Sequence, residues 1–239
     1  MQKFVVQGSF WDLFPDSTLG VIVAHDLKPA TEVSEADRTE LADLLAKAND
    51  KAATWCPLDP VSKNEVVAVW REAYKLFKTK RGARCSIENL LKRASKGNPV
   101  GPITPSVDVY NILSLTYALP FGGEDISTFV GDLRLGVVDE EKAFRPLGEQ
   151  DDPALPGELC YYDGAGAVCR CWNWRDGQRT ALTDTTRDAF LITECVDAAR
   201  AEDARRATDE FASMMERYLG ATIAQKSMVT RESPEVALA

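Results

Sequence analysis

Apolar residues in the first half of the chain occur either in short unbroken runs or at every third or fourth position. Residues 20–24 are an unbroken run and predict a buried strand. The sequence Ser34-Glu35-Ala36-Asp37 resembles a capping box, so a helix is expected to begin there. Helical spacing also predicts helices over 62–79, directly after Ser86, and over 106–118.

Shorter apolar segments fill the second half. They predict strands at 131–138, 143–147, 158–163, 166–174 and 189–195. An amphipathic helix is expected over about 198–219, and the chain from Gln225 onward is expected to be loose. Helices followed by a strand-rich middle and a final helix indicate an α+β fold.

Composition limits the class of protein. The chain has 239 residues, 45% of them hydrophobic, which is enough for one substantial core. Neither an apolar run of about 20 residues nor a secretory signal is evident, so we expect a cytoplasmic protein with no membrane contact. Six cysteines without a C-x-x-C spacing and a single histidine, His25, make a metal site improbable, and no cofactor is predicted.

Charge is distributed unevenly. The net charge is −9, yet the segment from Arg71 to Lys96 holds nine basic and two acidic residues, so it carries +7 and the remainder −16. Such a segment can bind phosphates while the rest of the surface repels nucleic acid. A solvated helix face rich in lysine explains the same pattern equally well.

Two polar groups interrupt otherwise apolar elements. Asp108 and Asn111 project from one face of the helix predicted over 106–118, where Asp108 can serve as a helix cap but an amide amid apolar residues needs partners. Gly122-Gly123, followed by Glu124 and Asp125, predicts either a tight bend or a backbone site for an oxyanion.

The second polar group lies in the run 169–177. Arg170, Asn173 and Arg175 alternate there with Trp172 and Trp174. Either the strand turns a polar face to solvent, or the mixture of arginine and aromatic residues stacks on a base or binds a terminal phosphate. Common catalytic motifs are absent, and His25 at the end of a predicted buried strand is expected to be structural, which disfavours histidine-based catalysis.

At these same residues the sequence resembles the B3/B4 tRNA-editing domain of the phenylalanyl-tRNA synthetase β subunit, and more closely the freestanding members of that family. The resemblance covers about 81–197. The segments that carry it are Pro105-x-x-Asp108-Val109-Tyr110-Asn111, Leu119-Pro120-x-Gly122-Gly123-Glu124-Asp125, Gly131-Asp132-Leu133-Arg134-Leu135, Pro156-Gly157-Glu158, Asp163, Cys171-Trp172-Asn173-Trp174-Arg175, Thr180 and Thr183. The chain departs from the synthetase domain at Gly122, where that domain has histidine, and at Tyr110, where it has threonine.

The resemblance implies a layered sandwich of mixed sheets with flanking helices. It divides the chain into an N-terminal part at 1–80, an editing domain at 81–220 and a flexible tail at 221–239. It further implies catalytic roles for Asn111, Gly122 and Gly123, substrate binding by Asp108, Tyr110, Glu124, Asp125, Asn173 and Glu194, and tRNA binding by Arg81, Arg84, Arg170 and Arg175.

The function implied is that of a trans-editing deacylase, which hydrolyses the ester of a mischarged tRNA. By resemblance, the leading substrate is canavanine on arginine tRNA, or else another non-cognate aminoacyl-tRNA. Glu124, Asp125 and Glu194 suit canavanine chemically, because carboxylates bind a planar guanidinooxy cation in a forked geometry. Substrate-assisted catalysis, with backbone N–H groups at Gly122-Gly123 binding the oxyanion, fits a site without histidine. A non-catalytic RNA-binding module of the same fold and a sensor of a free amino acid are the alternatives.

Overall fold

The computed structural model describes residues 1–238, whose strands divide between two sheets. The larger sheet has the order β10-β1-β4-β5-β6-β7 and is antiparallel except where β1 and β4 run parallel. The smaller sheet is antiparallel, with the order β3-β8-β2-β9. The strands are β1 (Lys3–Val6), β2 (Thr18–His25), β3 (Phe121–Asp125), β4 (Leu133–Val137), β5 (Leu159–Asp163), β6 (Gly166–Arg170), β7 (Arg175–Asp176), β8 (Ala189–Cys195), β9 (Thr222–Val229) and β10 (Glu235–Ala237).

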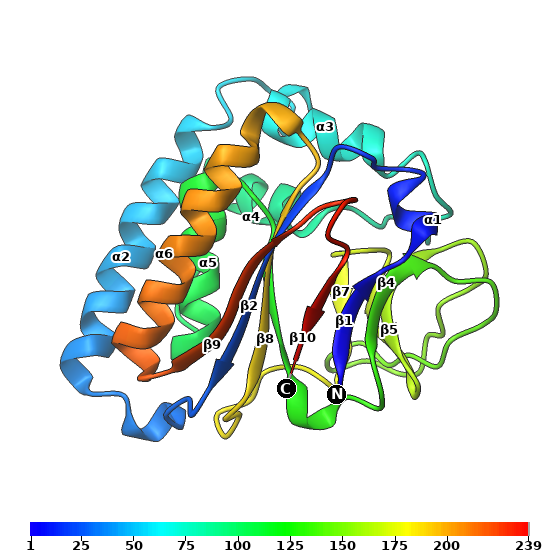
Figure 1. Ribbon diagram of the computed structural model, residues 1–239. Coiled ribbons are helices and arrows are strands. Elements are labelled where there is room, and N and C mark those ends of the chain that lie inside the picture. Colours follow the sequence, from blue (N-terminus) through cyan, green and yellow to red (C-terminus); the bar gives the residue numbers. More distant parts are fainter. Residues whose placement is uncertain (239) are drawn as a thin grey trace.

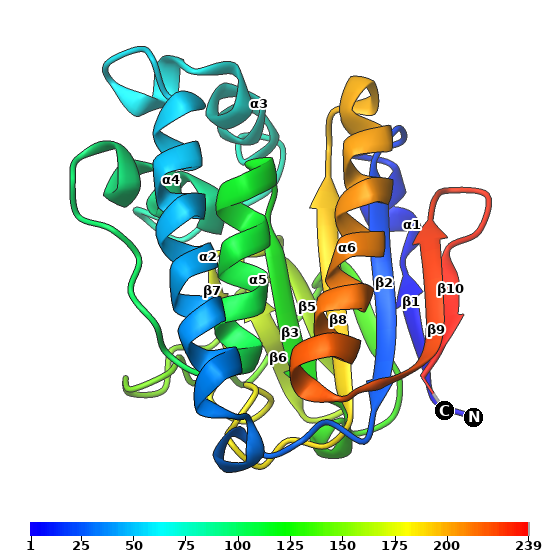
Figure 2. The same ribbon diagram turned by 90° about the vertical axis from the view of Figure 1, so that its left-hand side faces the viewer.

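Three long helices cover one face of the smaller sheet. Figures 1 and 2 show α2, α5 and α6 side by side on this face, while the larger sheet lies against the opposite face. The shorter helices α3 and α4 lie toward one end of the sheets. The helices are α1 (Gly8–Trp11), α2 (Glu35–Thr54), α3 (Glu65–Ala73), α4 (Ser86–Ser95), α5 (Pro105–Tyr117) and α6 (Ala201–Leu219). This arrangement confirms the predicted α+β fold with flanking helices.

Aromatic side chains join the two sheets. Phe4 on β1 lies 4.9 Å from Phe190 on β8 between ring centroids and stacks with Tyr161 on β5. Because β2 lies between this interior and the α6 layer, it is buried on both faces, which explains its unbroken apolar run. At the start of α2, Ser34 accepts a hydrogen bond from the Asp37 N–H, as the capping pattern predicts.

The end of the chain differs from the prediction. Residues of the expected flexible tail form β9 and β10, which pair with β2 and β1. Sequence pattern could not show this, because β9 is an exposed edge strand whose stability comes from its backbone ladder rather than from an apolar face. Since β1 and β2 enter different sheets, residues 1–80 contribute to both layers, and the proposed boundary at residue 80 stays a prediction.

Three other elements also differ. The helix expected over 62–79 ends at Ala73. The chain is extended by Lys78, because the Lys78 N–H donates to the Gly157 carbonyl and Lys78 forms an isolated bridge with Glu158, just before β5. Residues 143–147 make only an isolated bridge at Pro146, which lacks the N–H that a ladder needs. The Gly122-Gly123 segment, expected to form a turn, lies inside β3.

Within residues 1–238, no helix combines the length and apolar character that crossing a membrane requires. All six cysteines are free thiols, and only Cys56 is more than slightly exposed.

Candidate functional site

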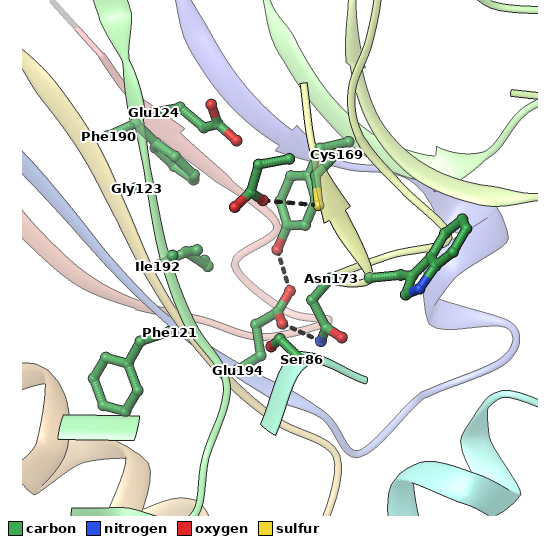
Figure 3. A pocket seen from close by; sticks show the side chains of 13 residues that line it. Ser86, Phe121, Gly123, Glu124, Cys169, Asn173, Phe190, Ile192 and Glu194 are labelled. Atoms are coloured by element: carbon green, nitrogen blue, oxygen red, sulfur yellow. Dashed lines mark hydrogen bonds between the residues drawn. The ribbon is translucent and has the colours of Figure 1, made fainter. Parts of the chain in front are cut away.

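A cavity of about 80 Å³ lies between the two sheets. Its floor is the inner face of β3 and β8, and its other walls come from β5, β6, β7, the turn at 171–174 and the first residue of α4 (Figure 3). The lining side chains that carry charge or hydrogen-bonding groups are Ser86, Glu124, Tyr161, Cys169, Asn173, Trp174, Asp176 and Glu194. The sequence-predicted residues Gly122, Gly123, Glu124, Asn173 and Glu194 therefore meet in one pocket.

Glu194 at one end of the pocket is held by three donors. The Tyr161 hydroxyl donates to its Oε1 over 2.5 Å, the Trp172 indole N–H donates to the same oxygen over 2.6 Å, and the Asn173 amide donates to Oε2. Burial raises the pKa of Glu194 to about 7, although these three hydrogen bonds oppose the shift. The side chain is thus fixed in position and changes charge near neutral pH.

Asn173 is oriented by two features of its surroundings. The Tyr74 hydroxyl donates to the Asn173 side-chain oxygen over 2.8 Å, which turns the amide nitrogen toward Glu194. The strand expected over 166–174 ends at Arg170, because Cys171 and Trp172 both adopt left-handed backbone conformations, with φ of 48° and 63°. Each such residue costs about 1–2 kcal/mol, so this turn is strained where it presents Trp172 and Asn173 to the pocket.

Glu124 and Asp176 line the same pocket, and none of the described residues that line it is cationic. Glu124 is 6% exposed, and its Oε2 has no hydrogen-bond partner among residues 1–238. Burial, followed by the charge of Asp176, raises the pKa of Glu124. Asp176 is the exposed member of the pair. Asp176 accepts only a weak bond from the Cys169 thiol, while the neighbouring Arg179 is bound by Asp163 at 2.8 and 2.9 Å. The pair therefore has the electrostatics of a cation site.

Three carboxylates and a thiol in one pocket raise the question of a metal. Within the part of the chain that the structure describes, no three histidine, cysteine, aspartate or glutamate side chains are grouped closely enough to hold a metal ion.

The strand register corrects the prediction that Gly122 and Gly123 bind an oxyanion. Glu194 N–H donates to the Pro120 carbonyl, which fixes the alternation of hydrogen bonds between β3 and β8. By that alternation the Gly122 N–H points to Ile192 and is used in the ladder, while the Gly123 N–H points to the outer edge of β3. Ladder N–H groups lie in the plane of the sheet, so neither is directed into the pocket.

Four residues predicted for the site do not line the pocket; three of them are on α5 and one is on β3. The carboxylate of Asp108 accepts from the Ile103 N–H, and that of Asp125 accepts from Ser127 and Thr186, so both have structural partners. Asn111 is buried on α5 and is not among the lining residues. Tyr110 is also on α5, where burial and the charges of Asp176 and Glu124 raise its pKa, so it lies near the acidic end without lining it. The four were predicted from their positions in a motif, and a motif does not specify the direction in which each side chain points.

The arginines predicted to bind tRNA fall into two groups. Arg170 is 1% exposed and makes a forked ion pair with Glu158, at 2.7 Å on both arms, so it cannot contact a partner and its assignment to tRNA was wrong. Arg81 is exposed, Arg84 is partly exposed and lies 3.5 Å from Glu88, and the partly exposed Arg175 guanidinium stacks over Trp174. None of these three is buried, although Arg175 also pairs with Glu149.

Some site residues were not predicted from the sequence. Tyr74 orients Asn173 and Tyr161 orients Glu194. Both tyrosines stand in apolar stretches of the sequence, where a tyrosine commonly packs in the core. Asp176, at the end of the aromatic run, was assigned no role. His25 accepts or donates a 2.6 Å hydrogen bond with Asp188 and does not line the pocket.

The chain is similar to a known protein family and to a solved structure. A family profile described as the B3/4 domain matches residues 69–230. Among solved structures, the chain is similar to an N-terminal fragment of the phenylalanyl-tRNA synthetase β subunit from Pyrococcus horikoshii, at 9% identity and a TM-score of 0.45, over 94% of this chain and 53% of that one. The chain thus spans about half the length of that fragment. No curated protein matches significantly.

Proposed function

Because the chain belongs to the B3/4 domain family, we propose that its pocket hydrolyses the ester between a non-cognate amino acid and the 3′ end of a tRNA. In this proposal the protein is a trans-editing deacylase of the cytoplasm. Its preferred substrate carries a cationic side chain, and canavanine on arginine tRNA is the first candidate.

The observation that supports this most is the Glu124–Asp176 pair. A buried carboxylate oxygen without a partner is costly, and two carboxylates side by side repel each other. A guanidinium or guanidinooxy group would supply both the missing charge and the missing donors, in the forked geometry that carboxylates favour. A neutral acyl side chain would leave the pair unsatisfied, so the same feature selects against it.

The reaction itself needs a water molecule and a donor for the developing oxyanion. Water adds to the ester carbonyl, the bond to the ribose oxygen breaks, and the products are the free amino acid and the tRNA with its terminal hydroxyl. Ser86 begins α4 at the pocket, and no side chain caps this helix among residues 1–238. Its hydroxyl and its own N–H group, at the positive end of the helix dipole, are the donors we assign to the oxyanion.

The tRNA would approach from the side of α4. Arg81 lies on the loop that leads into this helix, five positions before Ser86, and Arg175 is on the strand that carries Asp176. Cations at these places would bind phosphates next to the acylated end.

A panel of tRNAs charged with different amino acids tests the proposal. The protein is incubated with canavanyl-, arginyl-, lysyl-, alanyl- and phenylalanyl-tRNA, and release of the free amino acid is followed. We expect the cationic acyl groups to be released fastest. Release at the spontaneous rate from every tRNA, combined with salt-sensitive binding, would instead identify an RNA-binding module, and binding of a free amino acid without any tRNA binding would identify a sensor.

Hydrolysis of a cationic ester should depend on pH through the raised carboxyl pKa values. Burial raises the pKa of Glu124, the carboxyl assigned to the substrate cation, so Glu124 stays protonated to a higher pH than an ordinary glutamate. A protonated carboxyl carries no charge, so we expect KM for the cationic substrate to fall as pH rises through the raised pKa of Glu124. KM for an alanyl ester serves as the reference, and an equal fall for both substrates would contradict this assignment.

Charge reversal at two arginines should weaken tRNA binding. For Arg81→Glu with Arg84→Glu we expect the affinity for tRNA to fall at least about tenfold at low salt. We also expect the slope of log affinity against log salt concentration to be shallower by about two, since each removed phosphate contact lowers it by roughly one. Filter binding at several salt concentrations measures both. Arg205→Glu is the matched control, because Arg205 is exposed on α6, away from the pocket. Equal losses in both variants would remove the Arg81 region from the interface.

A further inference from the structure

Gly122 occupies the middle of the pocket floor. In the β3–β8 ladder, Gly122 pairs with Ile192 and Glu124 pairs with Phe190, and the pocket-facing side chains of β8 include Glu194 beyond them. Gly122 is thus the one position on this face of β3, between the two acidic ends, that contributes no side chain. Figure 3 shows Ile192, the cross-strand partner of Gly122, between Glu194 and the end marked by Glu124 and Phe190.

Neither the backbone nor the packing requires glycine at this position. The φ angle of Gly122 lies outside the left-handed region, so any residue can adopt it. A Cβ there would meet only the Ile192 Cγ2 atom, at an ordinary 3.5 Å. Gly123 differs, because its Cβ would approach Leu182 and Leu191 to 2.8 and 2.9 Å. Close packing explains Gly123, whereas at Gly122 the consequence of glycine is the space it leaves in the pocket.

That space connects the two ends of the pocket. Four positions separate Glu194 from Phe190, which is about 13 Å along a strand at about 3.3 Å per residue. A larger side chain at Gly122 would project into a cavity of only about 80 Å³ and divide it. With glycine, an extended ligand can reach from the Glu194 end to the Glu124–Asp176 end.

We infer that Gly122 determines the length of the acyl side chain that the pocket accepts, and that its glycine admits a long side chain with a terminal cation. This inference rests on the proposed function for the identity of the acyl group. Short side chains would enter the pocket but would not reach Glu124 and Asp176, so they would lose the charge contact. Gly122 is then a specificity-determining residue rather than a catalytic one.

Ligand binding tests the inference separately from hydrolysis. Calorimetry would compare L-argininamide and L-alaninamide, which mimic the acyl part of the ester, on the wild type, Gly122→Ala and Gly122→Leu. The wild type should bind argininamide at least about tenfold more tightly than alaninamide, and Gly122→Leu should lose this preference by a similar factor, with Gly122→Ala between them. Gly101→Leu is the matched control, because Gly101 is exposed in a loop with open space around its Cβ and an unrestricted φ.

The outcomes distinguish a failure of the inference about Gly122 from a failure of the proposed function. Argininamide binding that Gly122→Leu abolishes, in a protein that hydrolyses no aminoacyl-tRNA, would support the inference and contradict the proposed function. Undetectable binding of argininamide by the wild type, or an unchanged preference in Gly122→Leu, would overturn the inference. Melting temperatures of the variants would show that Gly122→Leu is folded, and Gly122→Ala provides the milder change if it is not.

Discussion

Replacing Glu124 by glutamine should lower the rate of hydrolysis of an arginyl or canavanyl ester by at least about 100-fold while changing the rate for an alanyl ester far less. The substitution keeps the shape of the side chain but removes the charge that a bound cation would neutralise. Truncating one partner of a buried, hydrogen-bonded charge pair typically costs about 2–5 kcal/mol, which corresponds to this range of rates. Measurement of kcat/KM for both esters on the same tRNA tests the expectation.

Two further variants sharpen this prediction. Asp176→Asn should act in the same direction, and because the two carboxylates share one cation, the double variant should lose less than the sum of the separate effects. Glu140→Gln is the matched control, since Glu140 is exposed and pairs with Lys142 outside the pocket lining. Equal losses for the arginyl and alanyl esters in Glu124→Gln would mean that Glu124 supports the pocket without recognising the side chain.

Elements with a strong local signal could be predicted from the sequence, and the reasons are visible in the structure. The cap at Ser34 and the unbroken apolar run of β2 each depend on residues close together in the chain. The strand β9 does not, because its order comes from pairing with β2, about 200 positions earlier. Gly122-Gly123 resembled a turn for the same reason, since it is held in β3 by β8.

The candidate site was predicted in part. Glu124, Asn173 and Glu194 do meet in one cavity, because the resemblance carried information about pairs distant in sequence. The direction of each side chain was beyond local reasoning. Asp125 follows Glu124 directly, yet alternation along β3 sends it to the opposite face, where it caps a turn. Asp176 joins the pocket only because the strained turn at 171–174 reverses the chain.

Arg170→Met should destabilise the fold by about 3–5 kcal/mol, because it would leave the Glu158 carboxylate buried without its partner. Arg170 and Glu158 are each 1% exposed and bind through two hydrogen bonds of 2.7 Å. Arg170 also lies 2.8 Å from Asp152, which in turn pairs with Lys80, so the arginine joins β6 to the loop before β5. Urea unfolding would measure the loss as a lower midpoint at an unchanged slope.

The companion variants decide between a structural and a binding role. Replacing both partners, in Arg170→Met with Glu158→Met, removes the orphaned charge, and a buried ion pair replaced by apolar residues is often neutral in stability. The double variant should therefore be more stable than Arg170→Met alone. Its affinity for tRNA should equal that of the wild type, because Arg170 has no surface from which to contact phosphate. A fully stable Arg170→Met protein with reduced tRNA affinity would instead restore this arginine to the interface.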